Sequence, residues 1–154
     1  MTNPHICIQH YDSPCGNIVL ASIDNKLCLC DWNDRACAER NKQRLMQLLN
    51  ADFRTETTAV LNQARKQLDE YFAGTRISFS IPLYPVGTEF QKKVWTSLLE
   101  IPYGETKSYK EIALKLNHAN GIRAVAQAIG ANRINIFIPC HRVVGSNHSL
   151  TGYA

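Results

Sequence analysis

The sequence Ile138-Pro139-Cys140-His141-Arg142-Val143-Val144 places a histidine and an arginine directly after a cysteine, at the end of an apolar run that starts at Ile134. A thiolate is the nucleophilic form of cysteine, and a neighbouring base or positive charge lowers the pKa of the thiol. The pattern predicts either a reactive Cys140 activated by His141 or a buried structural cysteine, because most free cysteines are inert small hydrophobic residues. The rest of the sequence has to decide between these two interpretations.

Length and composition indicate an ordinary globular protein of one domain or two small ones. The chain has 154 residues, of which 45% are hydrophobic and 19% charged, values typical of soluble domains. No apolar run reaches the roughly 18 residues of a membrane span, and the N-terminus lacks the charged and apolar regions of a secretory signal. We therefore expect a cytoplasmic protein with reduced cysteines and no membrane association.

The charge is unevenly distributed along the chain. Residues 1–87 carry nine basic and nine acidic side chains, so the whole net charge of +4 lies in residues 88–154. That half also contains Cys140. The imbalance favours a polyanionic partner for the second half, although a charge of this size is weak evidence by itself.

Five of the six cysteines lie in the first 40 residues, far from Cys140 in the sequence. Cys28 and Cys30 alternate within a strand-like run, which would place both thiols on the same face. A zinc site formed by these two cysteines with His5 and Cys7 is an alternative. No CxxC pair supports it, so we predict no metal site.

The first half has the pattern of a small sheet with helices. Alternation and turn residues predict antiparallel strands over 6–11, 17–23 and 26–32, helices over 36–49 and 58–72, and a further strand over 76–81. The proline-rich segment 82–87 then predicts an extended linker. We expect two domains, 1–84 and 88–154. The first is expected to be a scaffold, because its sequence shows no group of residues that could form a catalytic site.

The second half is predicted to be helical. Thr88 can cap a helix that runs to Glu100, and its expected buried face comprises Phe90, Val94, Trp95, Leu98 and Leu99. Ser108 and Glu111 form an S-x-x-E capping box before a helix over 109–116. A second short helix is expected over 122–129, with Arg123 in its first turn. This spacing suggests a helix-turn-helix, although any helical hairpin shows the same pattern.

Taken together, the second half resembles the O6-alkylguanine-DNA alkyltransferase family. The matching segments are Gly87–Trp95, Ile101–Thr106, Ser108-Tyr109, Arg123–Val125, Asn132, Pro139–Val143, Gly145-Ser146 and Leu150–Ala154. The first half fits more loosely, through Asp12-Ser13-Pro14, Gly16 and Asp69–Gly74. The resemblance implies an α/β (α+β) fold: a small N-terminal antiparallel sheet with helices, ribonuclease H-like, followed by a helical DNA-binding domain with a helix-turn-helix and an active-site loop.

The resemblance implies DNA repair by direct reversal. An alkyl group would pass irreversibly and stoichiometrically from O6-alkylguanine, and from O4-alkylthymine, to Cys140 after the base is flipped out of the duplex. His141 would take the thiol proton through a bridging water. The reaction would need no metal or organic cofactor, because a thiolate is already a strong nucleophile. The partner would be double-stranded DNA containing alkylated guanine, bound by a monomer.

The family's residue roles carry over onto matching positions. Arg123 would insert into the duplex where the base has left, Tyr109 would crowd the adjacent phosphate, and Asn132 would hold the active-site loop. Four further residues complete the expected DNA-binding set: Ser108, Ala124, Arg133 and Arg142. The substrate pocket would use the carbonyl groups of Cys140 and Val143, the Tyr153 hydroxyl and the Ala154 N–H, with Pro139 beside them.

The sequence departs from the family at two places. Arg133 and Asn135 stand where the family usually has prolines, which would loosen the hinge or add a phosphate contact. The family also continues past Ala154 with two glycines and a helix carrying the glutamate that orients the histidine. An alternative function is therefore a non-enzymatic binder of alkylated bases with weakened transfer. A transcription regulator would leave Pro139–Val143 unexplained, and a cysteine protease would need an oxyanion hole that the sequence does not indicate.

Overall fold

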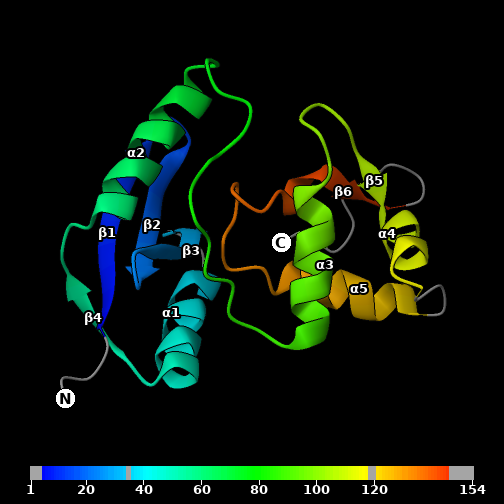
Figure 1. Cartoon of the computed structure of the whole chain (residues 1–154), viewed down its shortest axis with the longest axis horizontal. Coiled ribbons are helices and arrows are strands. Elements are labelled where there is room, and N and C mark those ends of the chain that lie inside the picture. Colours follow the sequence, from blue (N-terminus) through cyan, green and yellow to red (C-terminus); the bar gives the residue numbers. More distant parts are fainter. Residues whose placement is uncertain (1–4, 34–35, 118–120, 146–154) are drawn as a thin grey trace. The chain divides into compact units, whose positions relative to one another are not determined.

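The computed structural model describes residues 5–33, 36–117 and 121–145, and the chain divides into two compact units, residues 1–86 and 87–154 (Figure 1). In the described ranges, none of the helices has the length and apolar character needed to cross a membrane. Each unit has its own buried core.

The first unit is built on a four-stranded mixed sheet with the order β3-β2-β1-β4. Strands β1 (His5–Ser13), β2 (Gly16–Ile23) and β3 (Lys26–Trp32) pair antiparallel, as predicted. The turn between β2 and β3 has Asp24 and Asn25 at φ +52° and +57°, a backbone that these two residue types tolerate and that suits a two-residue hairpin. The predicted purely antiparallel sheet is wrong at its edge, because β4 (Asp52–Thr55) runs parallel to β1.

Two helices accompany this sheet, α1 (Ala36–Leu49) and α2 (Ala59–Phe72), and both confirm the predicted ranges to within a residue. Helix α2 is capped by the Thr58 side chain, which accepts from the Leu61 N–H. Its buried residues, Val60, Leu61, Ala64 and Leu68, recur at helical spacing and so form one apolar face.

The strand predicted over 76–81 is wrong. Side chains hold this segment to α2 in place of a strand ladder. The Gln67 amide donates to Ser80 Oγ at 2.7 Å and accepts from the Ser80 N–H at 3.0 Å, and Arg76 donates to Glu70 at 3.0 Å. The first part of the predicted linker is also docked, since the Tyr84 N–H donates to the Leu27 carbonyl of β3 at 2.7 Å.

The cysteines of β3 are part of the first unit's core. Cys28 and Cys30 are each 1% exposed. Burial raises the pKa of the Cys28 thiol to about 12, which makes it a poor nucleophile or metal ligand at neutral pH. Within the described residues, no group of three or more histidine, cysteine or acidic side chains could hold a metal ion.

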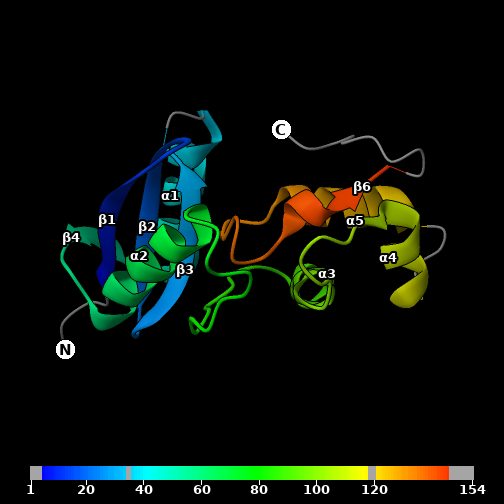
Figure 2. The same ribbon diagram turned by 90° about the horizontal axis from the view of Figure 1, so that it is seen from above.

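In its described residues, the second unit contains three α-helices and a two-stranded parallel sheet. The helices are α3 (Glu89–Leu99), α4 (Tyr109–Lys115) and α5 (Ile122–Gly130); the strands are β5 (Lys107–Ser108) and β6 (Val143–Val144). Helix α5 crosses α3 and also packs on α4 (Figures 1 and 2). Thus α4 and α5 are the two helices of the predicted helix-turn-helix. Residues 118–120 of the turn between them lie outside the described residues.

Side-chain capping explains where α3 and α4 begin. Thr88 and Gln91 form a reciprocal capping box at α3, and Ser108 and Glu111 form the predicted one at α4. The predicted buried face of α3 is wrong at Leu99, which is 49% exposed. Ser97 lies on the buried side instead and satisfies its hydroxyl by donating to the Val94 carbonyl at 2.6 Å.

Candidate active site

Cys140 lies at the start of a short 3-10 turn, η2 (Cys140–Arg142), and is 4% exposed. The chain before it is folded through tight turns. The Phe137 N–H donates to the Asn135 carbonyl at 2.8 Å across Ile136, whose φ is +72°. A γ-turn with a β-branched residue at positive φ is strained. The strain shows that packing fixes this loop in a conformation that its local sequence would not choose.

The Asn132 side chain forms hydrogen bonds to both ends of the loop. Its Oδ1 accepts from the Ile134 N–H at 3.0 Å, and its Nδ2 donates to the Ile138 carbonyl at 3.1 Å. The side chain is 5% exposed, so these bonds form away from water, where losing a partner is costly. The carbonyl of Ile138 also accepts from the Cys140 N–H at 2.8 Å. Asn132 is therefore linked to Cys140 through one backbone carbonyl.

The small parallel sheet brings helix α4 beside the cysteine. Lys107 pairs with Val143, and Ser108 pairs with Val144. Tyr109 follows at once and is 7% exposed. Burial raises the pKa of the Tyr109 hydroxyl, and the charge of the Cys140 thiolate raises it further. Tyr109, which is predicted to contact a DNA phosphate, therefore lies buried near Cys140 in this structure.

Ser108 was also expected at the DNA, and here its hydroxyl is engaged as the cap of α4. It accepts from the Glu111 N–H at 3.0 Å, and the Glu111 carboxylate accepts in turn from the Ser108 N–H at 3.3 Å. The residue is 8% exposed. Its visible role is to fix where α4 begins, and therefore where Tyr109 lies.

His141 and Arg142 complete the 3-10 turn. His141 is half-buried, and burial followed by the nearby Arg142 charge lowers the pKa of its imidazole. The neutral ring that results at neutral pH can accept a proton. Arg142 donates from Nη1 to the Ile101 carbonyl at 2.7 Å, and its guanidinium carbon lies 5.7 Å from the Tyr103 ring centroid. Arg142 therefore anchors the turn to the segment that follows α3.

Helix α5 presents one face to its own unit and the other to solvent. Val125, Ala128 and Ile129 are buried, and the Trp95 indole N–H donates to the Ala128 carbonyl at 2.8 Å. The exposed residues are Ile122, Arg123, Ala124, Gln127 and Gly130. Two of these, Arg123 and Ala124, were predicted. Gln127, which was not predicted, is exposed on the same helical face, four residues after Arg123.

The remaining predicted site residues are distributed as follows. Pro139 and Val143 are buried, and the Val143 N–H donates to the Cys140 carbonyl, which leaves that oxygen a second lone pair for another donor. Arg133 is half-buried. Tyr153 and Ala154, expected in the substrate pocket, lie outside the described residues.

One residue against the thiol was not predicted as part of the site. The Cys140 thiol donates to Asn135 Oδ1 at 3.3 Å, and Asn135 is 8% exposed. The sequence had marked this position only as a departure from a proline, with a loosened hinge or a phosphate contact as its expected consequence. The replacement of the usual proline by Asn135 was the available signal, because the asparagine side chain can form hydrogen bonds and the proline side chain cannot.

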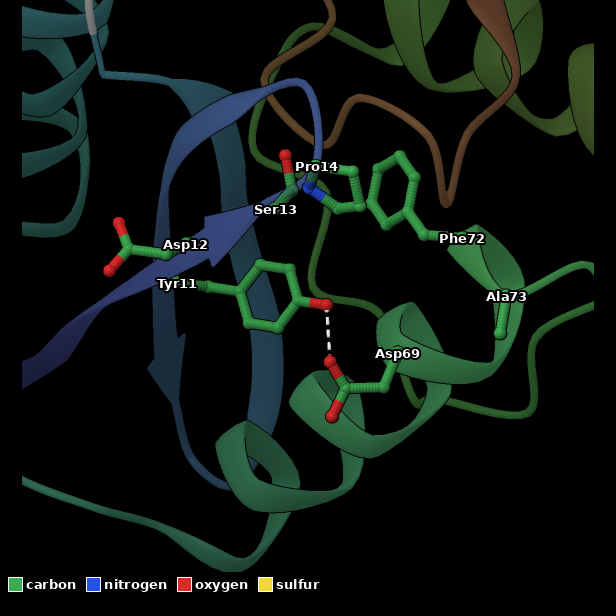
Figure 3. A pocket seen from close by; sticks show the side chains of 7 residues that line it. All are labelled: Tyr11, Asp12, Ser13, Pro14, Asp69, Phe72 and Ala73. Atoms are coloured by element: carbon green, nitrogen blue, oxygen red, sulfur yellow. Dashed lines mark hydrogen bonds between the residues drawn. The ribbon is translucent and has the colours of Figure 1, made fainter.

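A separate open pocket of about 490 Å³ lies in the first unit (Figure 3). Tyr11, Asp12, Ser13 and Pro14 line it at the end of β1, and Asp69, Phe72 and Ala73 line it from the end of α2. The Tyr11 hydroxyl donates to Asp69 Oδ1 at 2.5 Å, and burial together with this acceptor raises the pKa of Tyr11. The bond ties β1 to α2. Two of the loosely matching segments of the first half, Asp12-Ser13-Pro14 and Asp69–Gly74, thus lie beside each other at this pocket.

Comparison with known families covers nearly the whole chain. Residues 6–85 match the ribonuclease-like domain of 6-O-methylguanine DNA methyltransferase, and residues 89–154 match the DNA-binding domain of the same family. The chain belongs to the 6-O-methylguanine DNA methyltransferase family. This confirms the predicted family and the predicted fold class, apart from the parallel edge strand.

Individual relatives agree with this assignment. The constitutive methylated-DNA--protein-cysteine methyltransferase of Bacillus subtilis is 40% identical over 148 residues, which cover 93% of this chain and 83% of that protein. The Methanosarcina barkeri protein of the same name is 44% identical over 149 residues, covering 95% and 89%. The crystal structure of Mycobacterium tuberculosis O6-methylguanine methyltransferase superposes with a TM-score of 0.80 at 36% identity and covers 97% of this chain and 84% of that one.

Proposed function

We propose that this methyltransferase repairs DNA by moving the methyl group of O6-methylguanine onto Sγ of Cys140. The observation that carries the proposal is the position of Cys140, in a chain whose two halves both match the family. Its turn is held by Asn132, with a half-buried His141 next in sequence and Tyr109 close by. Both relatives compared above are named methylated-DNA--protein-cysteine methyltransferases.

The chemistry is a single displacement at carbon. Neutral His141 takes the Cys140 proton, and the thiolate attacks the methyl carbon. The S–C bond forms as the C–O6 bond breaks, and the purine regains a proton on N1 to become guanine. A thioether is stable and nothing in the reaction restores the thiol, so each molecule acts once. Longer O6-alkyl groups and O4-alkylthymine would react by the same displacement.

The target oxygen lies in a base stack, so the nucleotide must leave the duplex before it can reach the buried thiol. The exposed face of α5, with Arg123 at its first turn, suits close approach to a groove because Ala124 and Gly130 add almost no bulk. The +4 charge of residues 88–154 favours the phosphate backbone. The Mycobacterium tuberculosis relative has been solved in complex with DNA. We propose double-stranded DNA with an alkylated guanine as the partner, bound by one copy of the chain.

The test is the intact mass of the protein after incubation with a duplex containing O6-methylguanine. The expected result is a gain of one methyl group per molecule, absent with unmodified duplex and absent in Cys140→Ala. Cys28→Ala is the matched control, because it removes a different buried thiol and should leave the gain unchanged. Retained binding to the modified duplex without any gain of mass would instead support the binder of alkylated bases.

A further inference from the structure

We propose that Asn135 is a positioning residue for the alkyl-accepting thiol: its side-chain amide oxygen accepts the S–H hydrogen bond of resting Cys140 and fixes the direction of Sγ. This deepens the proposed function and rests on it for the identity of the reaction. The contact is 3.3 Å between Sγ and Oδ1, within the range of a hydrogen bond to sulfur. Both side chains are buried, at 4% and 8% exposure.

The backbone explains how a residue five positions before the cysteine comes to face it. Asn135 precedes the γ-turn at Ile136, where φ is +72°. The turn reverses the chain, and the Ile138 N–H closes it by donating to the Ile134 carbonyl at 3.0 Å. A strained turn between Asn135 and Cys140 is maintained only when the surrounding contacts favour it. Packing around the loop therefore sets the separation of the amide and the thiol.

The hydrogen bond has a chemical consequence for the resting protein. An amide oxygen can accept from a thiol but offers nothing to a thiolate, so in this geometry it favours the protonated form. Transfer of the proton to His141 requires the S–H bond to turn away from Asn135. A protein that reacts once would be wasted by a premature reaction with another electrophile. Asn135 thus holds Cys140 oriented and protonated until the substrate arrives.

Groups from several elements lie around the thiol. Tyr109 of α4 lies near it as a buried hydroxyl, and His141 and Arg142 follow it in the turn. Lys107 of β5 is paired with Val143 through the backbone. The buried face of α3 is uncharged, comprising Val94, Trp95, Ser97 and Leu98. A change of charge at position 135 should therefore be felt directly by Cys140.

The first measurement is the infrared S–H stretch of Cys140, isolated as the difference between each protein and the same protein carrying Cys140→Ala. A hydrogen-bonded thiol absorbs at lower wavenumber than a free one. Asn135→Leu keeps the branched shape of the side chain and removes the acceptor, so the band should move to higher wavenumber. The band of buried Cys28, isolated in the same way, should stay in place. A Cys140 band that does not move in Asn135→Leu overturns the proposal.

The second measurement is the pH profile of Cys140 alkylation by iodoacetamide, followed by peptide mass. Asn135→Asp puts a carboxylate of equal size against the thiol and should move the midpoint to higher pH by about one unit. Asn62→Asp, on the exposed side of α2, makes the same change of charge in the other unit and should leave the midpoint in place. An unmoved midpoint in Asn135→Asp also overturns the proposal, and this variant carries the test alone if Asn135→Leu does not fold. Neither measurement depends on methyl transfer, so failure here is distinct from failure of the proposed function.

Discussion

Two buried cysteines of this chain, Cys28 and Cys140, have almost equal exposure and very different surroundings. Cys28 is 1% exposed on strand β3, among apolar side chains of the first unit's core. Cys140 is 4% exposed on a 3-10 turn, with a histidine and an arginine next in sequence and an amide oxygen against its thiol. Burial on a regular strand raises the pKa of Cys28 to about 12. Cys28 therefore stays protonated at neutral pH and is a poor nucleophile.

The two thiols differ because the backbone around each cysteine places different groups next to the sulfur atom. A strand hydrogen-bonds to its neighbours and directs alternate side chains into a uniformly apolar layer. The turn at Cys140 instead follows a loop held by Asn132 and by the guanidinium of Arg142. Such a loop brings polar groups from separate elements to one sulfur atom. We therefore attribute the expected reactivity of Cys140 to its turn and to the residues that hold the turn. Burial alone does not predict whether a cysteine of this chain is reactive.

The largest expected effect comes from removing the residue that holds the turn. Asn132→Ala leaves the buried Ile134 N–H without its acceptor and removes one of the two donors to the Ile138 carbonyl, which should lower the free energy of unfolding by about 1–3 kcal/mol. We expect the single-turnover rate of methyl transfer to fall at least about a hundredfold, because the thiol loses its fixed position. Chemical denaturation and quenched-flow transfer assays measure the two effects.

Asn41→Ala is the matched control for that change. Asn41 donates to Asp31 Oδ2 at 2.9 Å in the first unit, so its loss should reduce stability and leave the transfer rate of the folded protein unchanged. An equal loss of rate in both variants would mean that stability, and not the turn, determines transfer.

A smaller effect is expected at Arg142, in the pH dependence of transfer. The pKa of His141 is lowered, first by burial and second by the Arg142 charge. Its neutral, proton-accepting form therefore persists below the ordinary histidine pKa, and transfer should decline only at lower pH. Arg142→Met removes one of the two causes, so the acid midpoint of the pH–rate profile should move upward.

Arg142→Lys is the comparison for this experiment. It keeps the positive charge but cannot reproduce the planar contact with Tyr103 or the geometry of the bond to Ile101. Its midpoint should stay near that of the wild type while its rate falls. Identical midpoints in all three proteins would show that the Arg142 charge does not reach the imidazole.

The smallest effect on transfer is expected at Cys28. Cys28→Ala should cost about 1–2 kcal/mol of stability through the cavity that it leaves, with no change in the transfer rate. Iodoacetamide labelling of the folded wild type at neutral pH should accordingly spare Cys28, as peptide mass can show. Rapid labelling of Cys28 in the folded protein would contradict the contrast drawn between the two thiols.

The helices and their boundaries were accessible from the sequence because their causes are local. The Ser108–Glu111 capping box and the apolar spacing of α2 fix those elements within a few residues. Strand β4 was missed because its four residues, Asp52–Thr55, are mostly polar and exposed. Segment 76–81 alternates like a strand, but Gln67 satisfies Ser80 from a neighbouring helix, a contact that no local pattern contains.

The sequence by itself predicted the family, the helices and Cys140 as the candidate nucleophile, because these depend on short motifs and on periodicity. Only the tertiary structure decided that Tyr109 is buried near the thiol, that Arg142 anchors the turn, and that Asn135 faces Sγ. These contacts require strand β6 to return beside β5 and a strained γ-turn to reverse the loop. Such geometry arises from packing between distant segments, and a one-dimensional pattern does not record which side chains packing will bring together.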